Sequence, residues 1–368
     1  MPSDEPTGER ADAATGRRPR LTPPIADVRR AVRAVLGPVG RAAPEARLET
    51  TGSHGLETPA APAGRPADAP LVLVALSGGA DSLALAAATA FEAPRAGLRA
   101  GAVIVDHGLQ EGSAEVAARV GAQAIALGLD PVLVRRVDVS GEGGPEASAR
   151  TARYAALDAA AVETGAALVL LGHTLDDQAE TVLLGLARGA GAASLAGMPA
   201  RSGRYVRPLL GIRRATTRQA CVDAGLAPWD DPHNLDPAYA RVRVRERVLP
   251  VLEAELGPGI AEALARTADQ LREDDEAFAA QIDEVIEELC EPAEAGIAVS
   301  AGALAANPAA LRQRIIRHVV ASEFGVALSR SQTLEVARLV TDWHGQGPID
   351  LPGCRAARVA GRIEFSAR

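Results

Sequence analysis

From residue 71 onward, short apolar runs alternate with stretches whose apolar residues recur at helical spacing. The runs are typical of buried strands and the stretches of amphipathic helices. The expected strands span 71–76, 100–106, 132–139 and 167–172, and the expected helices span 81–91, 113–128, 146–163 and 175–188. Regular alternation of this kind predicts an α/β fold with a doubly wound, Rossmann-like parallel sheet. Ligands of such sheets bind beyond the carboxyl ends of the strands.

The pattern changes on either side of this region. Helical periodicity predicts further helices over 212–225, 244–256, 258–290, 307–322 and 331–341. Before residue 70, one amphipathic helix is expected over 24–36, within a sequence rich in Pro, Ala, Gly and Arg. We therefore expect three parts: a leader helix with a flexible insertion over 1–69, the α/β domain over 70–240, and a smaller, mainly helical domain over 241–368.

Composition narrows the chemistry that the chain can perform. It contains no lysine, so all 39 basic residues among its 368 are arginines. Mechanisms that need a Schiff-base lysine, a Walker A lysine or a kinase strand lysine are excluded. Aromatic residues make up only 2%, which disfavours an RNA-binding platform of stacked aromatic rings.

Cysteine usage and hydropathy bear on metal binding and on location. The three cysteines lie far apart without a CxxC pair, so zinc, iron–sulfur and redox sites are not predicted. The N-terminus lacks the apolar stretch of a secretion signal, and no apolar run reaches the roughly 18 residues of a membrane span. We expect a cytoplasmic protein.

The turn after the first expected strand carries the most informative motif, LSGGADSLAL. Its candidate nucleotide-binding residues are Ser77, Gly78, Gly79, Ala80, Asp81 and Ser82. The glycines let phosphate approach the backbone amides, and the following helix N-terminus adds partial positive charge. Asp81 would repel phosphate directly, so we expect it to hold a divalent cation such as Mg²⁺. For SGG alone, a structural turn with a helix cap is the alternative.

This motif resembles the loop of the PP-loop ATP pyrophosphatase superfamily, whose members cleave ATP between the α- and β-phosphates. Four further strings follow in order: VDHGLQEGS (105–113), PEASARTARYAAL (145–157), LGHTLDDQAETVLLGLARGAG (171–191) and RPLL (207–210). Over about residues 71–250, the set resembles the tRNA(Ile)-lysidine synthase family. The end of the sequence resembles its shorter members, which lack an additional C-terminal domain.

The resemblance implies an ATP-dependent carbon–nitrogen ligase that modifies tRNA. Such an enzyme joins free L-lysine to C2 of the wobble cytidine in the CAU anticodon of an isoleucine tRNA. The reaction passes through an adenylated tRNA and releases PPi and AMP, with ATP as co-substrate and Mg²⁺ as the metal. The product, lysidine, changes codon reading from AUG to AUA and the tRNA's identity from Met to Ile.

Further residues complete the expected catalytic and nucleotide sites. Asp177 and Glu180 lie three positions apart on one helix face, where they could accept a proton from an amine, and Asp177 could join Asp81 in holding Mg²⁺. An acidic first turn that only favours the helix dipole is the alternative. The remaining expected catalytic residues are Arg150 and Arg153, and the remaining expected nucleotide contacts are His107 and His173. Their alternatives are a solvated helix face for the arginines and cap or core positions for the histidines.

A basic segment suggests an RNA surface. Residues 201–247 hold ten arginines against five acidic residues, in a chain of net charge −8. Such a segment suits an RNA backbone. The expected RNA-binding residues are Arg207, Asn234, Arg241, Arg243, Arg245 and Arg247. The family pattern has a serine at the position of His233 and an asparagine at the position of Val242. Whether this chain makes the contacts of those two family residues is left open.

Two other functions stay open from the sequence. A PP-loop tRNA thiolase would share the adenylation step but needs cysteines to carry sulfur, and the sequence has no paired cysteines. A nucleotide- or RNA-binding protein without catalysis is disfavoured by the carboxylates Asp81, Asp177 and Glu180. Exchange of PPi into ATP would separate an enzyme from a binding protein.

Overall fold

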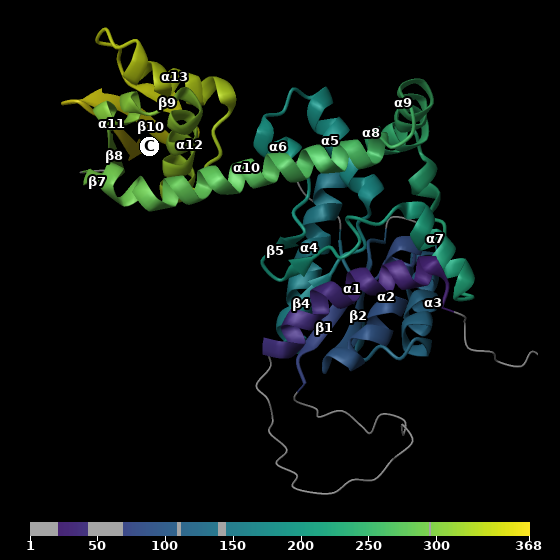
Figure 1. Ribbon diagram of the computed structural model, residues 1–368. Coiled ribbons are helices and arrows are strands. Elements are labelled where there is room, and N and C mark those ends of the chain that lie inside the picture. Colours follow the sequence, from purple (N-terminus) through teal and green to yellow (C-terminus); the bar gives the residue numbers. More distant parts are fainter. Residues whose placement is uncertain (1–20, 43–68, 109–111, 139–144, 294–295) are drawn as a thin grey trace, which may run out of the picture. The chain divides into compact units, whose positions relative to one another are not determined.

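The computed structural model describes residues 21–42, 69–108, 112–138, 145–293 and 296–368. Of the expected leader helix and flexible insertion over 1–69, residues 1–20 and 43–68 lie outside these ranges. The chain forms two compact units, Met1–Thr267 and Ala268–Arg368 (Figure 1). The division falls within the long helix α10 (Ile260–Leu289).

The first unit contains a six-stranded sheet in the order β3-β2-β1-β4-β6-β5. Its strands are β1 (Leu71–Ala75), β2 (Arg99–Asp106), β3 (Val132–Arg136), β4 (Leu168–Leu170), β5 (Arg201–Ser202) and β6 (Tyr205–Val206). All neighbours pair in parallel except β5, which is antiparallel to β6. Val72 of β1 is in register with Ala100 on one side and Leu168 on the other. The order of connections reverses between β1 and β4, which is where such sheets bind ligands.

Helices cover both faces of this sheet, because successive strand residues point to opposite sides. Val72 and Val74 pack in one core cluster with α1 (Pro23–Ala42), α2 (Ala80–Glu92), α3 (Ser113–Ala126) and α7 (Arg214–Asp223). Leu71 and Leu73 pack in another with α4 (Pro145–Thr164). The predicted α/β fold with a doubly wound parallel sheet is confirmed.

The first unit contains a separate cluster around Leu175 of α5 (Leu175–Ala187), Val244 of the π-helical turn η3 (Val244–Val248) and Leu249 of α9 (Leu249–Leu256). The remaining short elements of this unit are α6 (Ala192–Leu195), α8 (Ala240–Arg243) and the 3₁₀ turns η1 (Pro94–Ala96) and η2 (Pro232–Leu235). The N-terminal end of α10 joins this cluster through Ala261.

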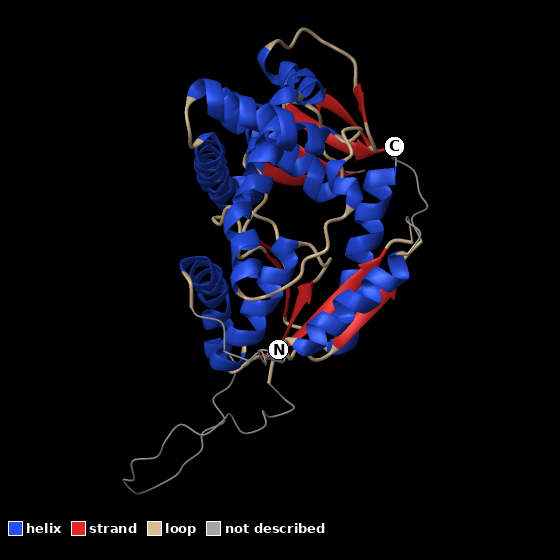
Figure 2. Ribbon diagram, turned by 90° about the vertical axis from the view of Figure 1, so that its right-hand side faces the viewer, coloured by secondary structure: helices blue, strands red, loops and turns tan. Residues whose placement is uncertain are grey.

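The second unit combines the expected helices with a sheet that the sequence did not predict (Figure 2). Besides the end of α10, its helices are α11 (Ala301–Ala306), α12 (Ala309–Phe324) and α13 (Arg330–Thr341). The antiparallel sheet, in the order β7-β8-β11-β10-β9, consists of β7 (Cys290–Ala293), β8 (Gly296–Ser300), β9 (Ile349–Leu351), β10 (Cys354–Val359) and β11 (Arg362–Ala367). One core, centred on Phe365 and Ile316, joins helices and sheet.

None of the helices in the described ranges combines the length and apolar character that a membrane crossing requires.

Candidate functional site

The candidate site is a cavity of about 650 Å³ at the carboxyl ends of β1 and β4. Its walls come from the loop and first turn after β1, from the segment after β4, from the start of α7 and from residues 229–246. The volume lies within the range of small-molecule sites, about 300–1,000 Å³. We call it the central cavity.

The loop after β1 is fixed by internal hydrogen bonds and by a glycine that no other residue could replace without strain. Gly78 has φ +87°, and an added Cβ would lie 2.5 Å from Cγ2 of Val120. The Ser77 amide donates to Oγ of Ser82 at 3.2 Å, and that hydroxyl donates to the Gly79 carbonyl at 3.0 Å. Gly79 caps α2 without a side-chain hydrogen bond to the first amides. These amides are therefore suited to receive an anion.

Gly172 brings the end of β4 against the start of α2. A Cβ on this glycine would lie 3.1 Å from both Cα and N of Ser82. The close backbone approach explains why the segment after β4 faces the loop, so that His173 and Asp177 line the same cavity as Asp81. Motifs about 90 residues apart in the sequence are thus brought together at the edge of the sheet.

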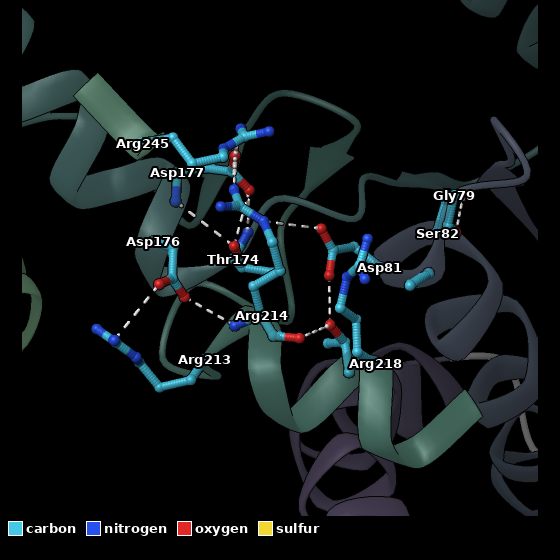
Figure 3. A network of polar contacts seen from close by, with 12 residues as sticks. Gly79, Asp81, Ser82, Thr174, Asp176, Asp177, Arg213, Arg214, Arg218 and Arg245 are labelled. Carbon is cyan, nitrogen blue, oxygen red and sulfur yellow. Dashed lines mark hydrogen bonds and ion pairs between the residues drawn. The ribbon is translucent and has the colours of Figure 1, made fainter. Parts of the chain in front are cut away.

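A single guanidinium joins the three expected catalytic carboxylates (Figure 3). Arg214 Nη2 lies 2.6 Å from Oδ1 of Asp177, and its Nη1 lies 3.1 Å from Oε1 of Glu180. Its Nε lies 3.5 Å from Oδ2 of Asp81. Arg214 was not predicted from the sequence. It is the first residue of α7, where the helix dipole disfavours a positive charge. An arginine at such an unfavourable position is the one feature of the sequence that could have pointed to a functional role.

Glu180 has no exposed side-chain surface and binds two further arginines. Arg245 donates to its two carboxylate oxygens at 2.7 and 3.0 Å, and Nε of Arg241 lies 3.7 Å away. Arg241 and Arg245, which the sequence suggested as RNA-binding residues, therefore point into the protein. Their guanidiniums offset the cost of burying this carboxylate.

The environments of Asp81 and Asp177, which both line the central cavity, differ. Burial raises the pKa of Asp81 above its usual value, although the Thr217 hydroxyl and Arg214 oppose this shift. Burial also acts to raise the pKa of Asp177, but Arg214 and the Thr174 amide outweigh it, so the pKa is lowered. Asp177 is thus a firmly ionised carboxylate. Its Oδ2 accepts the Thr174 amide at 2.8 Å in a capping box at the start of α5.

These aspartates do not form a metal site by themselves. In the described part of the chain, no three His, Cys, Asp or Glu side chains are grouped to hold a metal ion. Asp81 and Asp177, which were expected to hold Mg²⁺, instead share the guanidinium of Arg214. The cation that these two carboxylates share is therefore the Arg214 side chain of the protein itself.

Arg153 is a cation without an anionic partner among the described residues. It lines the central cavity, and no hydrogen bond or ion pair joins its guanidinium to any described residue. Burial lowers its pKa, and neighbouring Arg150 lowers it further, although Tyr154 opposes the shift. Arg150 itself is exposed and lies over the Tyr154 ring at 5.0 Å. A half-buried guanidinium on a cavity wall, without a partner among the described residues, is suited to an anionic ligand.

Both expected histidines have a buried Nδ1 without a hydrogen-bond partner among the described residues. Burial lowers the pKa of His173 to about 4, although Asp177 opposes the shift. The pKa of His107 is lowered as well, by burial and by Arg153. Both rings are therefore neutral at pH 7, and each retains a free hydrogen-bonding nitrogen.

A second, smaller cavity of about 160 Å³ adjoins the first. It lies at the end of β2, where Val116, Val120 and Trp229 give it an apolar wall and His107 a polar edge. Ser77, Trp229 and Asp231 line both cavities. Trp229 was not singled out from the sequence. Its amide donates to the Gly78 carbonyl at 2.9 Å, a contact that only the fold creates.

The remaining expected RNA-binding residues lie in different surroundings. Arg243 and Arg247 are exposed, and Asn234 is exposed on the wall of the central cavity. Arg207 differs from the expectation, because it is only 7% exposed and its Nη1 donates to the Pro199 carbonyl at 2.9 Å. Val242 occupies a buried position.

Comparison with known proteins gives matches along most of the sequence. A family model described as a PP-loop domain matches residues 54–252, and one described as the TilS substrate binding domain matches residues 299–364. The tRNA(Ile)-lysidine synthase of Leifsonia xyli subsp. xyli is 67% identical over 296 residues, which cover 80% of this chain and 89% of that protein. The tRNA(Ile)-lysidine synthase of Thermobifida fusca is 56% identical over 290 residues, 78% of this chain and 89% of that protein. The Salinispora tropica protein of the same name is 51% identical over 352 residues, 93% of this chain and 96% of that protein.

Proposed function

Because the chain belongs to the tRNA(Ile)-lysidine synthase family, we propose that it joins free L-lysine to the wobble cytidine of the isoleucine tRNA with the CAU anticodon, using ATP. The observation that carries the proposal is the half-buried Arg153, which has no anionic partner among the described residues and faces the same cavity as the loop after β1. A cavity with uncapped helix amides and an unpaired guanidinium suits a polyphosphate. The lysidine formed in the tRNA would change its codon reading from AUG to AUA.

In the first half-reaction, the cytidine O2 attacks the α-phosphorus of ATP. A bond forms between O2 and that phosphorus, and the bond to the β-phosphate oxygen breaks, which releases PPi. The amides at the start of α2 stabilise the departing PPi, and Arg153 stabilises charge on the α-phosphate. The adenosine occupies the smaller cavity beside Val120 and Trp229, with the neutral His107 as a hydrogen-bonding edge.

In the second half-reaction, the ε-amine of lysine attacks C2 of the cytidine. The C2–N bond forms, the C2–O bond breaks and AMP leaves. Lysine arrives as an ammonium, which must lose a proton before it can attack. Asp177 is the ionised carboxylate on the cavity wall that binds the ammonium and accepts this proton.

Glu180 is a positioning residue in this proposal. It has no exposed surface and holds Arg245 and Arg214 in place, so it does not contact substrate. The exposed Arg243 and Arg247, together with the second unit, bind the tRNA backbone. Arg207 is left out of this surface because it is buried. A tRNA substrate also implies a cytoplasmic protein.

The decisive test uses the purified protein, ATP, L-lysine and an unmodified isoleucine tRNA with the CAU anticodon. Mass spectrometry of the digested tRNA should detect lysidine only when all three substrates are present. In a single turnover without lysine, labelled ATP should give adenylated tRNA, and added lysine should convert it to lysidine. A protein that binds tRNA and ATP but forms neither product would contradict the proposal.

A separate experiment tests the role of Asp177. Asp177→Asn should accumulate adenylated tRNA and transfer lysine at least about 10²-fold more slowly, the lower end of the usual effect of a general base. Transfer at the wild-type rate would leave Asp177 with only its capping-box role.

A further inference from the structure

Arg214 holds together carboxylates from two separate parts of the sheet edge. Asp81 lies in the first turn of α2, whereas Asp177 and Glu180 lie in α5. The guanidinium contacts all three carboxylates, at 3.5, 2.6 and 3.1 Å respectively (Figure 3). Like charges this close repel one another, so the arrangement depends on a cation between them.

The three carboxylates do not depend on Arg214 equally. Glu180 also binds Arg241 and Arg245, and Asp177 lies 3.5 Å from Nη2 of Arg245. Among the residues that the structure describes, Arg214 is the only cation that forms an ion pair with Asp81. If Arg214 moved away, Asp81 would be the carboxylate left without a positive charge.

Arg214 and Asp81 both line the central cavity, where the proposed function requires the triphosphate to bind. The Arg214 side chain is 19% exposed, so a ligand in the cavity can reach it. Phosphate is a better bidentate partner for guanidinium than carboxylates that are already shared. A triphosphate would also repel Asp81, unless another cation came between them.

We infer that Arg214 fills the cation position of this site before ATP binds, and that it exchanges the carboxylates for the triphosphate when ATP enters together with its divalent ion. Arg214 is thus a positioning residue. It keeps Asp81, Asp177 and the loop after β1 together in the free protein, and it prevents a divalent ion from binding there without nucleotide. The inference rests on the proposed function only in naming ATP as the ligand.

The test measures binding of Mn²⁺ alone to the full chain, from the loss of the free Mn²⁺ signal in electron paramagnetic resonance. Without nucleotide, the wild-type protein should bind Mn²⁺ only weakly, whereas Arg214→Met should bind one Mn²⁺ at least about tenfold more tightly. Arg214→Lys, which retains the charge, should again exclude Mn²⁺. The matched control is Arg213→Met, because Arg213 pairs with Asp176 and Glu262 and not with Asp81. The control should behave as wild type.

Two results would overturn the inference. One is a saturable Mn²⁺ site in the nucleotide-free wild type with the affinity of Arg214→Met, and the other is a folded Arg214→Met protein that gains no Mn²⁺ binding. Should Arg214→Met fail to fold, the wild type decides alone, because its Mn²⁺ affinity should rise at least about tenfold when a non-cleavable ATP analogue is added, after subtraction of the Mn²⁺ that the analogue binds without protein. An unchanged affinity there contradicts the inference. If the wild-type protein did not exchange PPi into ATP, the proposed function would be contradicted, whereas the Mn²⁺ result would still stand.

Discussion

Asp81 is half-buried, pairs with Arg214 as its one cation among the described residues, and lies at the start of α2. The variant Asp81→Asn keeps the size of the side chain but removes its charge. In the proposed reaction, PPi exchange into ATP should fall by about 10²-fold or more, the scale of a lost electrostatic contact. Asp27→Asn on the surface of α1 is the matched control, since Asp27 is exposed and pairs only with Arg30 among the described residues. Near-wild-type exchange by folded Asp81→Asn would remove this residue from the reaction.

His173 provides a prediction about stability and pH. Burial lowers its pKa from the usual 6.5 to about 4 in the folded protein. Between these pH values the unfolded chain binds the proton and the folded chain does not, so the free energy of unfolding rises with pH across this window. The contribution is complete above pH 6.5 and is lost as the pH falls towards 4.

The variant His173→Gln lacks this titration. Urea unfolding at pH 7 and pH 5 should therefore show a smaller loss of stability for the variant than for the wild type. The comparison uses the difference between two pH values, which separates titration from any lost packing. Equal losses in both proteins would mean that the ring stays accessible to protons in the folded state.

The loop after β1 and the carboxylates after β4 could be predicted because each is a local string that follows an apolar strand. Arg214 and Trp229 could not be predicted in this way, because their roles arise from contacts across the fold. Arg214 meets Asp81, which lies more than a hundred residues earlier in the sequence, and the Trp229 amide meets the Gly78 carbonyl. Spacing within a motif carries no information about such pairs.

At the scale of elements, the approach of β4 to α2 depends on Gly172. In Gly172→Ala the new Cβ would meet backbone atoms of Ser82 at 3.1 Å, so the strand end and the helix start must separate. We expect a loss of about 1–3 kcal/mol in the free energy of unfolding, the usual cost of overpacking. PPi exchange should also fall, because the loop and Asp177 would move apart.

Gly211→Ala is a suitable control, since a Cβ at Gly211 would meet nothing within 4 Å. Urea unfolding and PPi exchange of both variants give the comparison. Equal stability and equal exchange in the two variants would show that the contact between β4 and α2 tolerates a side chain.

The segment 240–248 shows what helical spacing alone could and could not predict. Arg241 and Arg245 are four residues apart and share one face, as do Arg243 and Arg247. The sequence therefore indicates two faces, but it does not say which one is buried. The partner of the inner pair is Glu180, which lies in a different helix, and that contact divides one basic segment into an inner and an outer pair.

Strands that read as apolar runs were predicted, and short strands of mixed character were missed. β1 is buried along its whole length and reads as a continuous apolar run. In the second unit, β10 (CRAARV) and β11 (RIEFSA) alternate buried and exposed residues over only six positions. β7 even contains a proline. Such short, mixed runs are not distinguishable from loops by their pattern.

At the scale of the whole molecule, the proposed function places the reaction of ATP in the central cavity and the binding of tRNA on other surfaces of the protein. Two exposed arginines, Arg243 and Arg247, belong to the tRNA surface in this proposal. In Arg243→Glu/Arg247→Glu, tRNA affinity should fall, and the slope of log affinity against log salt should decrease by about two, one unit for each lost phosphate contact. ATP binding should stay unchanged, because neither side chain lines the central cavity.

The matched control is Arg30→Glu/Arg119→Glu, which makes the same change in net charge at exposed positions of α1 and α3. A lower overall charge weakens binding to any polyanion, so the control measures this general effect. Local phosphate contacts at Arg243 and Arg247 predict a larger loss of affinity and a smaller salt slope in their variant than in the control. Filter binding of labelled tRNA at several salt concentrations measures both quantities. If the two variants gave the same slope, the tRNA would be held by the field of the whole molecule and not by this pair, and the surface would have to be sought on the arginines of the second unit.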